Sequence, residues 1–216
     1  MIVIDLQEDK GLESIELYLR MAQEYDEKRF YEEALVWYKK IENNPKVYER
    51  IGEYYYLGYG CGRDKNEAEK YFEKAAQYDN VDALCNLALC KNQLEEKLML
   101  YKRAANQGAP YAMNMVGIIL EELQNQESSQ AIEWFKKSAD AGYPVGCFNY
   151  AMNVGDPTEK MNYLKKAADK REVHAILKYA EYLEKGQYCE KDEKKAKQLR
   201  MNLTRVNNAP YNKSNY

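Results

Sequence analysis

The sequence predicts an all-α fold, a right-handed superhelical α/α solenoid of about six helix-turn-helix repeats. Two observations lead to this prediction. A small residue recurs six times inside the same apolar frame, at intervals of 30, 36, 29, 34 and 29 residues, and each recurrence is followed by a segment with its own repeating pattern. Repeats of this length that bury an apolar side only against their neighbours form stacked arrays. The six small residues are Ala22, Gly52, Ala88, Gly117, Ala151 and Ala180.

The first predicted helix of each repeat carries an apolar stripe around its small residue. Positions five and one before the small residue and three after it are mostly apolar, and these spacings share one side of a helix. The second repeat shows the stripe with Val47, Ile51 and Tyr55, whereas the third has Lys91 at the last position. We expect the stripe to face the interior of the array.

The second predicted helix carries two bulky apolar residues, two charged residues and two small residues, as in the segment from Tyr71 to Ala76. This order places the bulky side chains in the core, the charged pair in water and the small pair where another backbone comes close. Two of these helices begin with a capping box, Asp64 with Glu67 and Asp156 with Glu159.

The same register predicts the boundaries of the repeats. The solenoid is expected over residues 12–204, with repeats near 12–44, 45–80, 81–109, 110–143, 144–172 and 173–204. Residues 1–11 are expected to form an N-terminal cover segment, and the polar residues 205–216 a flexible C-terminal tail. The third and fifth repeats have short connections between their helices, so long and short repeats alternate.

Composition and charge indicate a soluble cytoplasmic protein. Charged residues make up 31% of the chain and the formal net charge is −3, a balance that argues against a nucleic-acid partner. No run approaches the about 18 apolar residues of a membrane span, and no secretory signal is apparent at the N-terminus. The five cysteines are an odd number and are expected to be reduced packing residues.

The sequence contains no pattern that indicates a reaction. His174 is the single histidine, which excludes a multi-histidine metal site, and it is expected to be an ordinary polar residue at a helix entry. The glycine-rich segment 58–63 could cradle a phosphate, but a helix rather than a strand precedes it, so a turn with positive φ is the favoured interpretation. We therefore predict no catalytic residue, no cofactor and no metal site, and we expect the protein not to be an enzyme.

These motifs resemble the Sel-one-like repeat family, which is related to the tetratricopeptide repeats. The second repeat carries most of the family pattern in Ile51-Gly52, Tyr55, the turn 58–62, Ala68 and the segment 71–76. The fourth repeat carries it in Ala112, Val116-Gly117, Ala131, Trp134-Phe135 and the segment 137–142. The resemblance covers roughly residues 12–204. It implies a scaffold that brings partners together, and it chooses no partner.

In tetratricopeptide-like arrays the first helices line a concave groove, so the sequence predicts a binding surface there. Positions six and three before and one and four after the small residue are expected to face the groove, with an apolar middle and acidic ends. The predicted partner-binding residues are Glu49, Glu53, Tyr56, Cys85, Leu89, Tyr111, Asn114, Ile118, Phe148, Met152, Leu177 and Glu181. An exposed apolar patch with a polar rim is typical of a protein or peptide site. The alternative is that these side chains pack on one another.

The predicted function is a non-enzymatic protein–protein interaction scaffold or adaptor. Its partner is expected to be a protein or peptide with hydrophobic anchors and basic flanks. A regulatory or inhibitory subunit of one specific enzyme is the alternative. A hydrolase would need a polar cluster deep in the groove, and neither spacing nor residue type supplies one. The sequence leaves the oligomeric state and the identity of the partner open.

Overall fold

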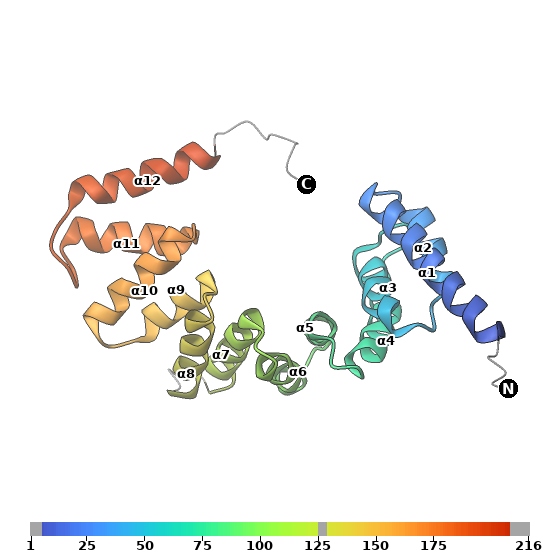
Figure 1. The fold of residues 1–216 in the computed structure, drawn as a ribbon. Helices are drawn as coiled ribbons and strands as arrows, with labels where there is room; N and C mark the ends of the chain where they lie inside the picture. Colours follow the sequence, from blue (N-terminus) through green and yellow to red (C-terminus); the bar gives the residue numbers. More distant parts are fainter. Residues whose placement is uncertain (1–5, 125–128, 208–216) are drawn as a thin grey trace. The chain divides into compact units, whose positions relative to one another are not determined.

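The computed structural model describes residues 6–124 and 129–207, which form twelve α-helices and no strand (Figure 1). The helices are α1 (Leu6–Glu27), α2 (Tyr31–Lys40), α3 (Pro45–Leu57), α4 (Lys65–Ala76), α5 (Val81–Cys90), α6 (Leu94–Asn106), α7 (Pro110–Gln124), α8 (Ser129–Asp140), α9 (Pro144–Asn153), α10 (Pro157–Asp169), α11 (Val173–Lys185) and α12 (Glu193–Asn207). The predicted all-α repeat array is confirmed. Its superhelical hand stays a prediction.

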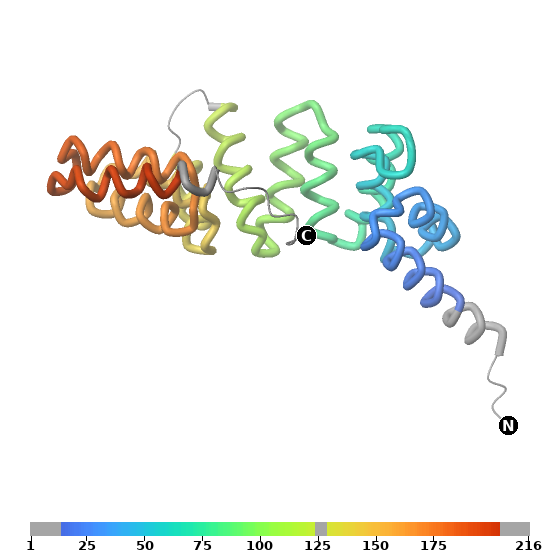
Figure 2. The backbone as a smooth tube through the Cα atoms, turned by 90° about the horizontal axis from the view of Figure 1, so that it is seen from above, coloured from blue at the N-terminus to red at the C-terminus, as the bar shows by residue number. Residues whose placement is uncertain are grey.

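The chain divides into two compact units after Ala104, within α6. In unit one α1 packs along α2, α3 packs along α4, and α4 also contacts α5. In unit two each helix from α7 to α12 packs on the next one in sequence (Figures 1 and 2). Helices that contact mainly their sequence neighbours are characteristic of a repeat array.

The recurring small residues lie where a bulky side chain of the second helix fills the space above the first helix. All six are buried. A Cβ atom added to Gly52 would lie 2.6 Å from the ring of Phe72, and one added to Gly117 would lie 2.5 Å from the ring of Phe135. A side chain at either glycine would therefore overlap the ring of the second helix, which explains why the residue there is small.

The charged pair of the second helix is partly an exception to the prediction that it lies in water. Lys39 is half-buried, and its Nζ donates hydrogen bonds to the Tyr71 hydroxyl (2.6 Å) and to Glu42 (3.0 Å). Because Tyr71 belongs to the next repeat, this lysine joins two repeats. In α2 and α8 the other lysine covers a half-buried tryptophan, with Lys40 Nζ 3.5 Å from the ring centroid of Trp37 and Lys137 Nζ 4.1 Å from that of Trp134.

Both ends of the array differ from the expected boundaries. Helix α1 begins at Leu6, so residues 6–11 belong to the first helix and are not a separate cover segment. The run 7–10 consists mainly of good helix formers, which favours this extension. Helix α12 continues to Asn207, so the expected tail from residue 205 begins inside a helix. Residues 1–5 and 208–216 lie outside the described ranges.

The predicted helix starts and the glycine turn are confirmed. Asp64 accepts hydrogen bonds from the backbone N–H groups of Asn66 and Glu67, both at 3.0 Å, and Asp156 accepts one from Glu159 at 2.7 Å. In the turn between α3 and α4, Gly58 and Gly60 have φ values of +79° and +63°. This left-handed backbone is the conformation that favours glycine.

The short connection of the fifth repeat is completed by a buried lysine. Lys160 is only 7% exposed, and its Nζ donates to the carbonyl oxygens of Ala151 (2.7 Å) and Met152 (3.3 Å) at the end of α9. The long second and fourth repeats have alanines, Ala68 and Ala131, at the same place in the pattern. Lys160 therefore satisfies carbonyl groups that a helix end leaves without partners.

Replacing Lys160 with methionine is expected to lower the free energy of unfolding by about 1–3 kcal/mol, because buried carbonyl groups lose their donor. Urea unfolding followed by circular dichroism measures this loss. Lys165→Met, on the exposed side of the same helix, is the matched control and is expected to change stability by less than about 0.5 kcal/mol. Equal effects of the two substitutions would contradict a capping role.

Candidate partner-binding surfaces

The predicted binding residues lie on the first helices of five repeats and form two groups. The group in unit one consists of Glu49, Glu53 and Tyr56 on α3 and Cys85 and Leu89 on α5. The group in unit two consists of Tyr111, Asn114 and Ile118 on α7, Phe148 and Met152 on α9, and Leu177 and Glu181 on α11. We call the first group, together with Asp82, the acidic surface and the second group the apolar surface.

Most of these side chains are accessible to a partner. Asp82, Leu89, Tyr111 and Leu177 are exposed, and all the others except Asn114 are half-buried. Asn114 is only 2% exposed, because its Oδ1 accepts a hydrogen bond from Asn149 Nδ2 at 2.8 Å. Asn114 is therefore not exposed as expected, and its hydrogen-bond partner Asn149 is a residue that the sequence did not single out.

The Asn149–Asn114 hydrogen bond has a counterpart in unit one. Asn86 Nδ2 donates to Glu49 Oε1 at 3.4 Å. In both cases the donor is an asparagine that lies two positions before the small residue of a short repeat. The acceptor lies three positions before the small residue of the long repeat that precedes it. This recurrence of asparagine was visible in the sequence, and it could have identified the contact.

The guanidinium group of Arg50 on α3 is already paired with two carboxylates. Arg50 forms two hydrogen bonds of 2.7 Å with Asp26 of α1 and a 2.5 Å hydrogen bond with Glu53. Burial raises the pKa of Glu49 to about 7, and the nearby negative charges of Glu53 and Asp82 add to the effect. Glu49 is therefore partly protonated at neutral pH, and a cation brought by a partner would favour its charged form.

The raised pKa of Glu49 predicts that stability falls as the pH rises from about 5 to 8. The folded chain binds a proton in this window that the unfolded chain, with an ordinary carboxyl group, has already lost, so the slope of stability against pH is negative. We expect Glu49→Gln to remove a difference on the order of 1 kcal/mol, reduced because the group is partly exposed. Melting temperatures of both proteins across this range test it. Parallel profiles would contradict the assignment.

The apolar surface of unit two combines aromatic and aliphatic side chains. Phe148 lies against His174, with 5.8 Å between ring centroids, and Tyr111 lies edge-on to Tyr143 at 6.2 Å. Glu181, expected to be one of the acidic ends, is paired with Lys185 at 2.7 Å and Lys178 at 2.9 Å. These lysines lower its pKa to about 2. The surface therefore offers apolar area together with a neutralised ion pair.

The described residues show little that would support catalysis. None of the clusters of histidine, cysteine and carboxylate side chains among them could hold a metal ion, and none of the helices there is long and apolar enough to cross a bilayer. All five cysteines are free thiols, and burial raises the pKa of Cys85 to about 11, which makes it a poor nucleophile.

Paired helices in a repeating register, with a small residue under a bulky one, define a helical repeat protein of the tetratricopeptide-like class. The family model for the Sel1 repeat matches residues 45–77, 98–108, 110–143 and 173–199. The chain belongs to the Sel1 repeat family. The first helices of the two short repeats fall outside the matched ranges, as expected from their departures from the pattern.

Solved structures share this fold. A Sel1 repeat protein from Oxalobacter formigenes is 23% identical with a TM-score of 0.77, over 88% of this chain and 85% of that one. The protective antigen c5321 from uropathogenic Escherichia coli, which displays an SLR fold, is 20% identical with a TM-score of 0.77, over 86% of this chain and 44% of that one. The type IV pilus biogenesis factor PilW is 22% identical with a TM-score of 0.58, over 92% and 95%. No curated protein sequence matches the chain significantly.

Proposed function

We propose that this protein is a non-enzymatic scaffold that binds a partner protein or peptide on its first helices. The observation that carries the proposal is the apolar surface, where exposed Tyr111 and Leu177 flank half-buried Ile118, Phe148 and Met152. Aromatic and aliphatic side chains that are already held in place by a rigid helix array are effective anchors for a partner. Sel1 repeats typically mediate protein interactions, in agreement with this role.

The acidic surface supports a basic flank in the partner. Glu49 and Asp82 lie close together, and their one neighbouring arginine, Arg50, is shared between Asp26 and Glu53. A lysine or arginine from a partner would supply the missing positive charge. We further propose that the protein works in a reducing compartment such as the cytoplasm, which five free cysteines support.

Peptides with hydrophobic anchors and basic flanks, titrated by fluorescence anisotropy, test the proposal. Phe148→Glu and Ile118→Glu are each expected to weaken binding about thirtyfold, because each places a charge inside the apolar contact. Met99→Glu changes a residue that is 60% exposed on a second helix, and it is expected to leave affinity unchanged.

Circular dichroism of each variant separates a binding defect from unfolding. Unchanged peptide affinity in a folded Phe148→Glu variant would rule out the apolar surface as the binding site. Equal losses in Phe148→Glu and Met99→Glu would show that the peptide binds through non-specific attraction.

A further inference from the structure

Neighbouring repeats dock through one repeated pair of positions. The residue five before the small residue is buried in every repeat from the second to the sixth, and Val47, Ala83, Ala112 and Ala175 have no exposed surface. Its partner is the fifth residue of the preceding second-helix pattern. Gly146 leaves no room for a Cβ next to Ser138 of α8, and Val47 shares a core cluster with Ile41 of α2. Within each unit, an inner repeat therefore fills the position offered by the repeat before it.

At both ends of the described part of the array, one half of this pair is at least partly exposed. Leu17 occupies the first position in the first repeat and is 45% exposed. Leu203 occupies the second position in the sixth repeat, where Ser138 and the other inner residues are buried, and it is partly exposed. A leucine at each end is unusual for a solvated cap, which would be expected to carry polar residues there.

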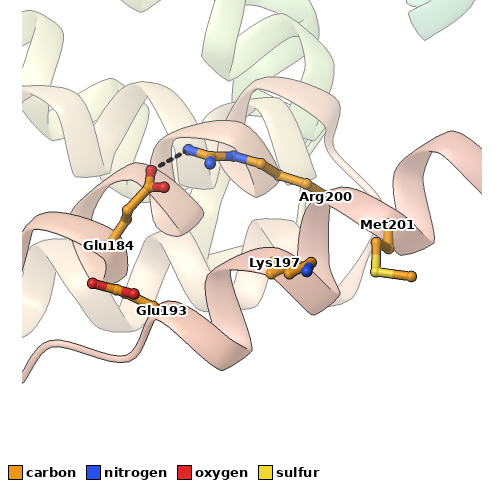
Figure 3. A pocket seen from close by; sticks show the side chains of 5 residues that line it. All are labelled: Glu184, Glu193, Lys197, Arg200 and Met201. Carbon is orange, nitrogen blue, oxygen red and sulfur yellow. Dashed lines mark hydrogen bonds and ion pairs between the residues drawn. The ribbon is translucent and has the colours of Figure 1, made fainter.

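A cleft at the C-terminal end lies where a following repeat would dock. It has a volume of about 360 Å³ and is lined by Glu184, Glu193, Lys197, Arg200 and Met201, from α11 and α12 (Figure 3). In the second repeat, the places of Lys197 and Met201 are taken by Glu69 and Glu73. Both glutamates accept hydrogen bonds from Lys91 of the next repeat, at 2.6 and 3.0 Å. The cleft thus corresponds to the seat of the next first helix.

We propose that a second copy of this chain occupies that seat, with Leu17 of one copy packed on Leu203 of another. The contact would be head to tail, because its two sides are different surfaces. Charge complementarity favours this occupant. The inner contact pairs Lys91 with two glutamates, whereas the C-terminal face carries Lys197 at the place of the first glutamate. Glu24, 54% exposed on α1 and paired with Lys28 at 2.6 Å, stands next to the equivalent of Lys91 and could form an ion pair with Lys197.

The inner repeats show that two large residues fit at this contact. Val47 and Ile41 are both bulky, and both are buried in the same cluster. A Leu17–Leu203 pair would therefore need no small residue on either side. Because head-to-tail contacts leave one free face at each end of the complex, the oligomer is expected to grow with protein concentration.

Sedimentation velocity across a concentration series tests the proposal with the full chain alone. The wild type is expected to show a mass that rises with concentration, and Leu17→Glu and Leu203→Glu are each expected to stay monomeric. An equimolar mixture of the two variants is expected to form dimers and to stop there. One variant retains an intact C-terminal face and the other an intact N-terminal face, and the remaining two faces both carry glutamate.

Leu177→Glu is the matched control, since Leu177 is exposed to a similar extent (44%) but belongs to the apolar surface. This variant is expected to oligomerise as the wild type does. Assembly is measured without peptide. The assembly proposal can therefore fail while the peptide-binding proposal holds, and the peptide-binding proposal can fail while the assembly proposal holds. A wild type that stays monomeric at all concentrations, or a mixture of variants that stays monomeric, would overturn the proposal.

Discussion

Replacing Phe135 with alanine is expected to lower the free energy of unfolding by about 3–5 kcal/mol, as large-to-small substitutions in packed cores do. The Phe135 ring is fully buried, and it lies directly on Gly117 of the partner helix. Its removal leaves a cavity between the two helices of one repeat. Only side chains of the neighbouring repeats could move to fill part of this cavity. Urea unfolding of the variant measures the loss.

A double-mutant cycle shows whether the glycine and the ring act as a pair. Gly117→Ala alone is expected to cost about 1–3 kcal/mol, since its Cβ would overlap the ring. In a Phe135→Leu background the same Gly117→Ala change is expected to cost less, because leucine gives the methyl group room. Additive effects would show that a glycine is needed at position 117 for another reason, such as local helix geometry.

Replacing Gly60 with alanine is expected to cost about 2–4 kcal/mol, from two sources that add. A non-glycine residue at φ +63° is strained, and the new Cβ would overlap the backbone of Tyr31 in the preceding repeat. The turn is thus both a left-handed bend and a contact between repeats. Thermal unfolding of Gly60→Ala beside the wild type gives the cost.

The sixth repeat provides the matched control for Gly60. Tyr188 holds the equivalent place with φ +62°, and its ring lies 5.0 Å from that of Tyr182. Tyr188→Ala keeps the backbone strain and loses this ring contact, so a smaller cost of about 0.5–1.5 kcal/mol is expected. A Gly60→Ala cost no larger than the about 1–2 kcal/mol expected for left-handed backbone alone would show that contact with Tyr31 contributes nothing.

The sequence predicts the repeat register well because the register is a local property. The spacing around Gly52 and Gly117 places the stripe, and Asp64 and Asp156 place helix starts through bonds to residues two or three positions away. The pattern also distinguishes the two repeats in which a phenylalanine ring of the second helix lies directly on the first helix. Glycine stands at the small position in the two repeats whose second helix offers a phenylalanine, and alanine in the other four.

The contacts between repeats were less predictable, because they join residues that are far apart in the chain. Asn114 seemed to face outward from its helix position, yet Asn149, 35 residues later, covers it. Lys160 looked like any charged residue near a helix start, although its amino group is buried against the end of α9. Polar side chains of this kind depend on which backbone groups a neighbouring turn leaves unsatisfied, and a periodic pattern does not contain that information.

The two tryptophans make the energetics of this array directly observable. The chain has only two, Trp37 in unit one and Trp134 in unit two, each at the same place of a second helix and each beneath a lysine. A Trp134→Phe variant would therefore report on unit one through Trp37, and a Trp37→Phe variant would report on unit two through Trp134. Coincident emission curves would mean that the halves melt as one cooperative block, and separate curves would yield the coupling energy between them.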